Sequence, residues 1–463
     1  MNWDDYAQWG RHIADWGAEY HKSLRDRPVR AQTAPGAIAA QLPAAPPDAP
    51  EAMDAIMADF DAIVMPGMTH WQHPRFFAYF ASNAAPPSML AEQLVNTVAA
   101  QCMLWQTSPA ATEFEGVMVD WLRQALDLPA PYTGVIQDSA SSATLSAVLT
   151  MRERATGYTG NREGLGGKGH LRVYCSEEVH SSIDRAAWVA GIGQDNLIKL
   201  PTKGPRFAMD VDALRAAITA DIAAGHTPAG IIAITGGTGV GASDDLGPIL
   251  AVAKEHDLYT HLDAAWAGAA MICPEFHAAF WDGVAGYDSI VFNPHKWLGA
   301  QFDCSVQFLR DPTPQLNTLK IEPEYLKTSG DAVTNYSEWT IPLGRRFRAL
   351  KLWFLIRSYG LDGLRSRIRN HVAWAGELAG ALRDAGFEIT SEPILSLFSF
   401  RCPGSDDDQQ RLVDALNDDG RIYLTQGAFQ GRKVIRFQVG QFDCTRDDVM
   451  MARDVIDEVW KSL

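Results

Sequence analysis

Polar groups of four different kinds follow four short apolar runs of the sequence. An imidazole (His180), a carboxylate (Asp263) and an amine (Lys296) each come after one run, and a fourth run leads into Thr235-Gly-Gly-Thr-Gly. The runs alternate with helical stretches, which predicts an α/β sheet. Ligands of open α/β sheets bind beyond the carboxyl ends of the strands, so we expect these groups to share one site. The runs are residues 171–175, 231–234, 259–262 and 289–292.

Together these groups meet the chemical needs of pyridoxal phosphate. A lysine amine forms a Schiff base with this cofactor, and a carboxylate keeps the pyridine nitrogen protonated so that the ring accepts electrons. An imidazole can stack on the ring. The segment Ser139-Ala-Ser-Ser142 opens a predicted helix over 143–154, whose N-terminal N–H groups and dipole favour a phosphate. Each group alone is a common turn, surface or core residue, so their joint placement carries the prediction.

Three parts are predicted along the 463 residues, which exceed the usual limit of a single core. Residues 1–84 form an N-terminal helical segment. Residues 85–346 form a large α/β domain with a mostly parallel central sheet. Residues 347–463 form a small C-terminal α+β domain, in which a long helical stretch precedes the apolar runs 395–400 and 434–439.

Aromatic residues near the N-terminus recur at steps of three and four, which places them on one stripe of a helix. We expect an apolar stripe of this kind to be buried against another protein surface. Packing on a second copy of the chain and packing on its own domain both remain open, and we favour a homodimer. The stripe consists of Tyr6, Trp9, Ile13, Trp16 and Tyr20.

Charge and composition exclude several classes of partner. A net charge of −16 repels nucleic acid and anionic membrane surfaces. Six cysteines without a CxxC pair predict reduced, buried thiols. The sequence has no run of eighteen apolar residues, and its start lacks the basic and apolar regions of a signal peptide, so we expect a cytoplasmic protein.

Several longer motifs carry a resemblance to a known family. They are Met65-Pro-Gly-Met-Thr-His-Trp71, His73-Pro-Arg-Phe-Phe-Ala-Tyr-Phe80, Ser108-Pro-Ala, Asn293-Pro-His-Lys-Trp297 and Pro342-Leu-Gly-Arg-Arg-Phe-Arg348. With these motifs the sequence resembles the group II pyridoxal-phosphate decarboxylases, specifically the aromatic L-amino acid decarboxylases. The resemblance covers nearly the whole chain. It implies the fold of the fold-type I pyridoxal-phosphate enzymes, and conversion of an aromatic L-amino acid to the arylalkylamine and CO2.

The resemblance also implies roles for individual residues. Lys296 is the implied Schiff-base residue, Asp263 the partner of the pyridine nitrogen, and His180 the residue stacked on the ring. The implied cofactor-binding set is completed by Ser139, Ala140, Ser141, Thr238, Asn293 and His295. In the family the substrate cleft lies at the dimer interface, and the matching positions here are Trp71, Tyr79, Phe80, Ser82, Met103 and Gly344.

A polar segment at 320–331 is interpreted as a mobile lid over the site, with a plain surface loop as the alternative. In the family this loop carries the tyrosine of Tyr-Leu-Lys, which Tyr325 matches, whereas related aldehyde synthases carry phenylalanine. A phenol can deliver a proton to a carbanionic Cα and a phenyl ring cannot. The resemblance therefore implies Tyr325 as the proton donor and an amine as the product.

Two departures from the family pattern bear on specificity and cofactor binding. Met103 stands where relatives have an aromatic residue, which predicts a softer pocket wall and a broader preference. Relatives are rich in threonine in the loop at 236–241, whereas here only Thr238 offers a hydroxyl.

Other functions fit the sequence less well. The glycine spacing in the 236–241 loop is G-x-G-x-G rather than the G-x-G-x-x-G of dinucleotide-binding proteins, which disfavours an oxidoreductase. No HExxH or CxxC frame supports a metal, so none is predicted. An aminotransferase, a decarboxylase of a non-aromatic amino acid and a non-enzymatic cofactor-binding protein remain as alternatives. The candidate metal ligands considered were His256, His261, Asp263 and His277.

Overall fold

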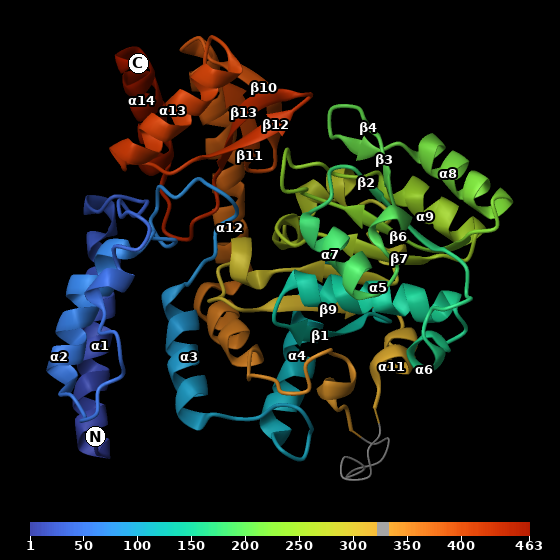
Figure 1. The fold of residues 1–463 in the computed structure, drawn as a ribbon, viewed down its shortest axis with the longest axis horizontal. Coiled ribbons are helices and arrows are strands. Elements are labelled where there is room, and N and C mark those ends of the chain that lie inside the picture. Colours follow the sequence, from blue (N-terminus) through green and yellow to red (C-terminus); the bar gives the residue numbers. More distant parts are fainter. Residues whose placement is uncertain (322–332) are drawn as a thin grey trace. The chain divides into compact units, whose positions relative to one another are not determined.

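The computed structural model describes residues 1–321 and 333–463 (Figure 1). The α-helices are α1 (Trp3–Ser23), α2 (Met53–Asp59), α3 (Pro86–Val98), α4 (Pro109–Ala125), α5 (Ala140–Ala155), α6 (Gly160–Glu163), α7 (Ser181–Val189), α8 (Val211–Ala223), α9 (Leu246–Glu255), α10 (His277–Phe280), α11 (Thr313–Leu319), α12 (Ala349–Asp384), α13 (Asp406–Asp419) and α14 (Arg446–Ser462). The strands are β1 (Thr133–Gln137), β2 (Leu171–Ser176), β3 (Leu197–Leu200), β4 (Thr202–Lys203), β5 (Ala208–Met209), β6 (Thr227–Ile234), β7 (Tyr259–Asp263), β8 (Ser289–Phe292), β9 (Ser305–Leu309), β10 (Glu388–Ile394), β11 (Leu397–Arg401), β12 (Thr425–Phe429) and β13 (Arg432–Gln438).

Two compact units make up the chain. The larger unit consists of residues 82–373 and 392–398. The smaller unit consists of residues 1–81, 374–391 and 399–463. The long helix α12 passes from one unit into the other. The predicted domain borders at 84 and 346 stay a prediction.

A seven-stranded sheet forms the centre of the larger unit, in the order β1-β9-β8-β7-β6-β2-β3. The strands from β3 to β8 along this order are parallel, and β9 is antiparallel to both of its neighbours. All residues of β7 and β8 are buried, as expected for strands covered on both faces. The four apolar runs are confirmed as parts of β2, β6, β7 and β8. The predicted fold-type I α/β class with a mostly parallel sheet is confirmed as well.

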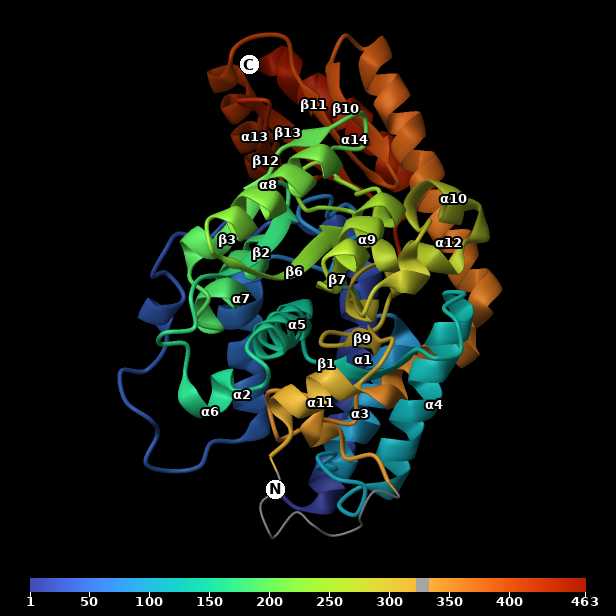
Figure 2. The same cartoon turned by 90° about the vertical axis from the view of Figure 1, so that its right-hand side faces the viewer.

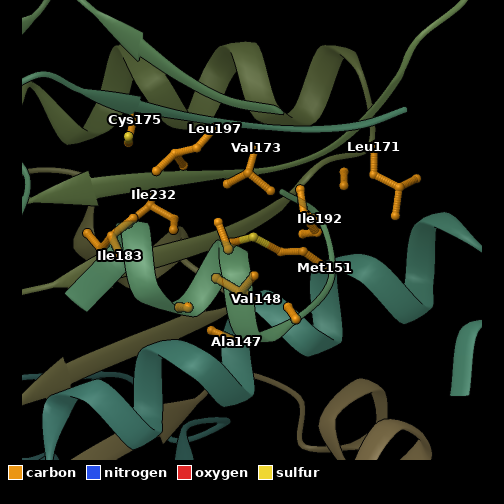
Figure 3. Packing of buried hydrophobic residues seen from close by; sticks show 14 of the residues in the cluster. Ala147, Val148, Met151, Leu171, Val173, Cys175, Ile183, Ile192, Leu197 and Ile232 are labelled. Carbon is orange, nitrogen blue, oxygen red and sulfur yellow. The ribbon is translucent and has the colours of Figure 1, made fainter. Parts of the chain in front are cut away.

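Helices pack on both faces of this sheet. On one face, Val148 and Met151 of α5 contact Val173 of β2 and Ile232 of β6, together with residues of α7 (Figure 3). Helix α5 lies very close to the sheet at Gly230 of β6. A Cβ on this glycine would lie only 2.4 Å from Sδ of Met151. On the other face, α8 and α9 pack against β6 (Figure 2). This core fixes the direction of α5, whose N-terminus points to the site described below.

The smaller unit contains most of a four-stranded sheet in the order β10-β11-β13-β12, against which α13 packs. Capping boxes at Ser405 and Thr445 start α13 and α14, and each capping side chain bonds the N–H of the third helical residue. This arrangement matches the predicted α+β pattern.

The predicted N-terminal helix is confirmed as α1 in the smaller unit. None of its residues is buried, and Tyr6 and Ile13 of the aromatic stripe are both exposed. The six cysteines are buried and form no disulfide, as predicted. Among the residues that the structure describes, no helix has the length and apolar character needed to cross a membrane.

Candidate active site

The loops after β6, β7 and β8 are bonded to one another at the carboxyl edge of the sheet. The N–H of Thr235 donates to the carbonyl of Asp263 at 3.0 Å, and the N–H of Asn293 donates to the carbonyl of Ala265 at 2.8 Å. Ser305, the first residue of the antiparallel strand β9, donates from Oγ to Oδ1 of Asn293 at 2.6 Å. The strand ends singled out in the sequence are therefore brought together.

Lys296 lies in a tight turn over Pro294–Leu298, where its own φ and ψ of −91° and −105° are not helical. Nδ2 of Asn83 donates to the Lys296 carbonyl at 2.6 Å, and the backbone N–H of Asn83 donates to the His295 carbonyl at 2.9 Å. Asn83 thus fixes the backbone of the lysine turn. It directly follows Ser82, so this predicted substrate residue lies next to a group that contacts the turn. No local pattern in the sequence indicates this role of Asn83.

His295 is buried beside the lysine. Its Nδ1 accepts the N–H of Cys304 at 3.0 Å, and the ring of Phe302 lies edge-on at 4.8 Å between centroids. Burial and, to a smaller extent, the charge of Lys296 lower the pKa of His295 to about 3, so the ring is neutral. Phe302 is 58% exposed next to this residue. Phe302 is thus a further candidate for the wall of the active site, and no local pattern in the sequence predicts it.

His180 lies within electrostatic reach of both Asp263 and Lys296. Oδ1 of Asp263 accepts the N–H of Ala265 at 3.0 Å. Nδ1 of His180 accepts the N–H of Ser182 at 3.2 Å and thereby caps α7. Loss of solvation lowers the pKa of His180, the Asp263 carboxylate raises it, and the Lys296 amine lowers it. The structure therefore brings His180 near two other residues of the predicted catalytic set, and their catalytic roles stay a prediction.

The N-terminus of α5 offers hydrogen-bond donors to an anion. Ser139 caps the helix by accepting the N–H of Ser142 at 3.2 Å. The N–H groups of Ala140 and Ser141 belong to the first turn and have no acceptor within the helix. A phosphate suits this position. Of the predicted phosphate-binding residues, Asn293 lies in the loop after β8 and Thr238 in the loop after β6.

The loop after β6 places a buried polar atom at the same edge of the sheet and packs closely against the loop after β7. The hydroxyl of Thr235 is buried and has no hydrogen-bond partner among the described residues. Gly236 has a positive φ of 79°, and a Cβ there would lie 2.5 Å from Cβ of Ala267. An amine, a carboxylate, an imidazole and an anion-binding helix end are the donor set that pyridoxal phosphate requires, so the residues present fit this cofactor.

Three of the predicted substrate residues gather in the smaller unit. The rings of Trp71 and Tyr79 lie 5.9 Å apart, and the Arg436 guanidinium lies 4.5 Å from the centroid of Phe80. Arg436 also donates to the carbonyl of Tyr79. Tyr79 has a positive φ of 47°, a conformation that persists only where the surroundings hold it. Trp71 and Tyr79 thus stack on each other, and Arg436 links Phe80 to them, so we call these three residues the aromatic cluster.

Met103 and Gly344 lie in a second group, in the larger unit. Oε1 of Gln101 accepts the N–H of Arg345 at 2.7 Å, and the N–H of Cys102 donates to the Arg345 carbonyl at 3.0 Å. Nε2 of Gln101 therefore faces Gly344, 3.4 Å from the place of a Cβ on that residue. Gln101 is not predictable from the sequence, because its position depends on the contact between residues 101–102 and Arg345. The predicted proton donor Tyr325 lies outside the described residues.

The histidines considered as metal ligands are engaged elsewhere. Nδ1 of His261 lies 2.9 Å from Oγ of Ser289, and its Nε2 lies 3.3 Å from Oγ1 of Thr144. Nε2 of His277 bonds the carbonyl of Met271 at 2.7 Å. Within 1–321 and 333–463, no group of three or more His, Cys, Asp or Glu is placed to hold a metal ion.

Three buried histidines of the larger unit predict a marked loss of stability in acid. Burial lowers the pKa of His295 and His371 to about 3 and that of His261 to about 4. The unfolded chain binds these three protons below about pH 6.5, whereas the folded chain does not until far lower. Stability is fully present above pH 6.5, and each histidine removes about 1.4 kcal/mol per pH unit as the pH falls below it.

Urea unfolding at pH 7, 6 and 5 measures this effect. His261→Gln is expected to lower the pH slope by one proton, and His12→Gln on the exposed helix α1 should leave it unchanged. An unchanged slope in His261→Gln contradicts the assignment of a neutral, buried ring.

The fold and the site define an enzyme of the pyridoxal-phosphate class. The family model described as the pyridoxal-dependent decarboxylase conserved domain matches residues 35–403. The chain belongs to this family, so it is a carboxy-lyase with pyridoxal 5'-phosphate as cofactor.

Known relatives and solved structures match this chain over nearly its full length. Aromatic-L-amino-acid decarboxylase of Sus scrofa is 38% identical and aligns with 95% of this chain and 93% of its own. Phenylacetaldehyde synthase of Arabidopsis thaliana is 36% identical, with 95% and 91% covered. The crystal structure of Oryza sativa TDC with PLP and tryptamine has a TM-score of 0.96 at 33% identity, and covers 100% of this chain and 99% of that one.

Proposed function

We propose that the protein removes CO2 from an aromatic L-amino acid and releases the arylalkylamine. The observation that carries the proposal is the convergence of Lys296, Asp263 and His180 at the sheet edge where α5 begins. The aromatic cluster of Trp71, Tyr79 and Phe80 supports an aromatic side chain in the substrate. The similarity to aromatic-L-amino-acid decarboxylase supports the same substrate class.

Each residue has a defined task in this proposal. When bound, pyridoxal phosphate supplies an electron sink for the pair left on Cα as CO2 departs. Lys296 would hold the cofactor through its amine. The Asp263 carboxylate would keep a proton on the pyridine nitrogen, and the His180 ring would lie against the pyridine ring. Ala140 and Ser141 hold the phosphate through their N–H groups, and Asn293 and Thr238 lie nearby.

A panel of amino acids tests the function. CO2 release is measured for dopa, tyrosine, tryptophan, 5-hydroxytryptophan, phenylalanine, histidine and glutamate, with and without added pyridoxal phosphate. We expect the aromatic acids to react and glutamate to remain unchanged. Glutamate as the best substrate contradicts the aromatic assignment.

The product distinguishes a decarboxylase from an aldehyde synthase. We expect the amine, with Tyr325 as the donor of the proton to Cα. Amine and peroxide are measured side by side in the wild type and in Tyr325→Phe. Aldehyde and peroxide from the wild type favour the synthase, and a variant that still makes mainly amine at the wild-type rate removes Tyr325 from this role.

Gln101 is expected to favour rings that carry a hydroxyl. Its Oε1 is occupied by the N–H of Arg345, so its Nε2 is left as a donor beside Gly344. We expect Gln101→Met to lower the ratio of kcat/KM for tyrosine over phenylalanine by about three- to tenfold, the worth of one neutral hydrogen bond. Loosening of the fold affects both acids alike and cancels in this ratio. Gln106→Met, at a nearby exposed position, is the control, and an equal ratio in both variants contradicts the role of Gln101.

We further propose a homodimer in the cytoplasm. Helix α3 of the larger unit exposes Leu90, Leu94 and Val98 at steps of four, with exposed fractions of 48–69%. An apolar stripe of this kind suits a second copy of the chain, as do the exposed Trp3 and Tyr6 of α1. Six unpaired thiols suit a reducing compartment. Sedimentation of the wild type and of Leu94→Glu tests the dimer, because a charge in the stripe is expected to yield monomers.

A further inference from the structure

Two buried tryptophans lie directly behind the catalytic residues of the larger unit. Trp266 comes three residues after Asp263, and Trp297 directly follows Lys296. Their side chains are 2% and 1% exposed. Their rings stack with centroids 4.9 Å apart and planes 20° apart. The loop that carries the carboxylate and the turn that carries the amine are therefore packed against each other through this stack.

A hydrogen bond ties the stack to helix α12. Nε1 of Trp297 donates to Nδ1 of His371 at 2.9 Å, and both residues are buried. Burial and, to a smaller extent, the charge of Arg367 lower the pKa of His371 to about 3, so the ring is neutral and its Nδ1 can accept. The acceptor is thus available throughout the working range of pH.

Two arginines of helix α12 also bond the lysine turn and the loop after β7. Arg367 donates to the carbonyl of Leu298, at the end of the lysine turn, at 3.0 Å. Arg365 donates from Nε to the carbonyl of Ile272, where the segment after Trp266 ends, at 2.6 Å. On a third side, a Cβ on Gly236 would lie 2.8 Å from the Trp266 ring, so the loop after β6 also packs against this tryptophan.

We propose that Trp266, Trp297 and His371 form a buried brace that sets the position of Lys296 relative to Asp263. The two ends of the cofactor are held by these two residues, so their separation decides whether both can engage it at once. None of the three residues is expected to touch the reacting atoms, which makes them positioning residues. The Trp297–His371 hydrogen bond is the part of the brace that a substitution can remove while the fold is kept.

A double-mutant cycle tests the bond. His371→Leu removes the acceptor, whereas His371→Asn keeps an oxygen near the place of Nδ1. Trp297→Phe keeps a ring in the stack and removes the donor. Each variant is prepared as apoprotein and as holoenzyme, and its melting temperature is recorded. Trp281→Phe is the matched control, because Trp281 is a buried tryptophan of the same unit that lies outside the brace.

The readouts are cofactor affinity of the apoprotein, measured by quenching of tryptophan fluorescence, and the pH dependence of the visible cofactor band. We expect His371→Leu and Trp297→Phe each to weaken cofactor binding about tenfold, as for a buried donor or acceptor left unpaired, and to shift the midpoint of the band. The double variant should be no weaker than either single variant. His371→Asn should restore most of the loss.

A merely structural role predicts a different outcome. In that case Trp281→Phe and His371→Leu lower the melting temperature alike, the band midpoint stays at its wild-type pH, and the effects of the two single variants add. That result overturns the brace. It leaves the proposed reaction standing, because CO2 release from aromatic acids is measured independently.

Discussion

Lys296→Ala is expected to abolish the visible absorption of the holoenzyme and to lower kcat by about three orders of magnitude or more. The structure gives the reason. The backbone of this residue is fixed by Asn83, which donates to its carbonyl at 2.6 Å, so the amine is presented from a rigid turn beside Asp263 and His180. Among the described residues that converge at this edge of the sheet, the lysine supplies the nucleophilic amine. Alanine removes the amine and leaves the turn in place.

The measurement compares spectra, cofactor content and CO2 release at equal protein concentration. Lys254→Ala, which removes an exposed lysine of helix α9, should match the wild type in all three. Trapping of the cofactor with borohydride followed by peptide mapping should label residue 296. A label at another lysine, or an unchanged band in Lys296→Ala, places the covalent link elsewhere and removes the central assignment.

The parts of the fold that the sequence predicts best are those with a local signal. The strands β2, β6, β7 and β8 are continuous apolar runs because helices cover both faces of the sheet. The strands β1 and β9 cannot be recognised as continuous apolar runs, because buried polar residues interrupt them. Nε2 of Gln137 in β1 donates to Oε1 of Gln307 in β9 at 3.0 Å, so these two polar side chains are paired inside the core. No local pattern shows this pairing or the antiparallel direction of β9.

The same distinction holds for the site. Asp263 and Lys296 are predictable because the carboxyl ends of parallel strands share one edge of the sheet. The roles of Asn83 and His371 cannot be predicted in this way. These residues lie 213 and 74 positions from the groups they bond, and no local motif marks an asparagine or a histidine that has such a distant partner. The position of Gln101 against Gly344 is of the same kind. Contacts between residues far apart in the sequence therefore position the catalytic groups that local motifs predict.

Asp263→Asn is expected to keep most of the cofactor and to lose about two orders of magnitude or more in kcat. Oδ1 of Asp263 accepts the N–H of Ala265 at 3.0 Å, and the same bond orients an asparagine. The amide oxygen then takes the place of Oδ1, so the NH2 group faces the pyridine nitrogen. A donor at that place favours the unprotonated nitrogen, which makes the ring a poor electron sink. Binding through the phosphate and Lys296 is unaffected.

Cofactor released in alkali and CO2 from the best aromatic acid are measured on the same preparation, so that loss of chemistry is separated from loss of cofactor. Asp257→Asn is the matched control, because this aspartate has a 95% exposed side chain and lies just before β7. It should retain both cofactor and activity. A kcat for Asp263→Asn within about threefold of the wild type is incompatible with a charged partner for the pyridine nitrogen. Loss of cofactor in proportion to activity would instead mean that Asp263 serves binding rather than chemistry.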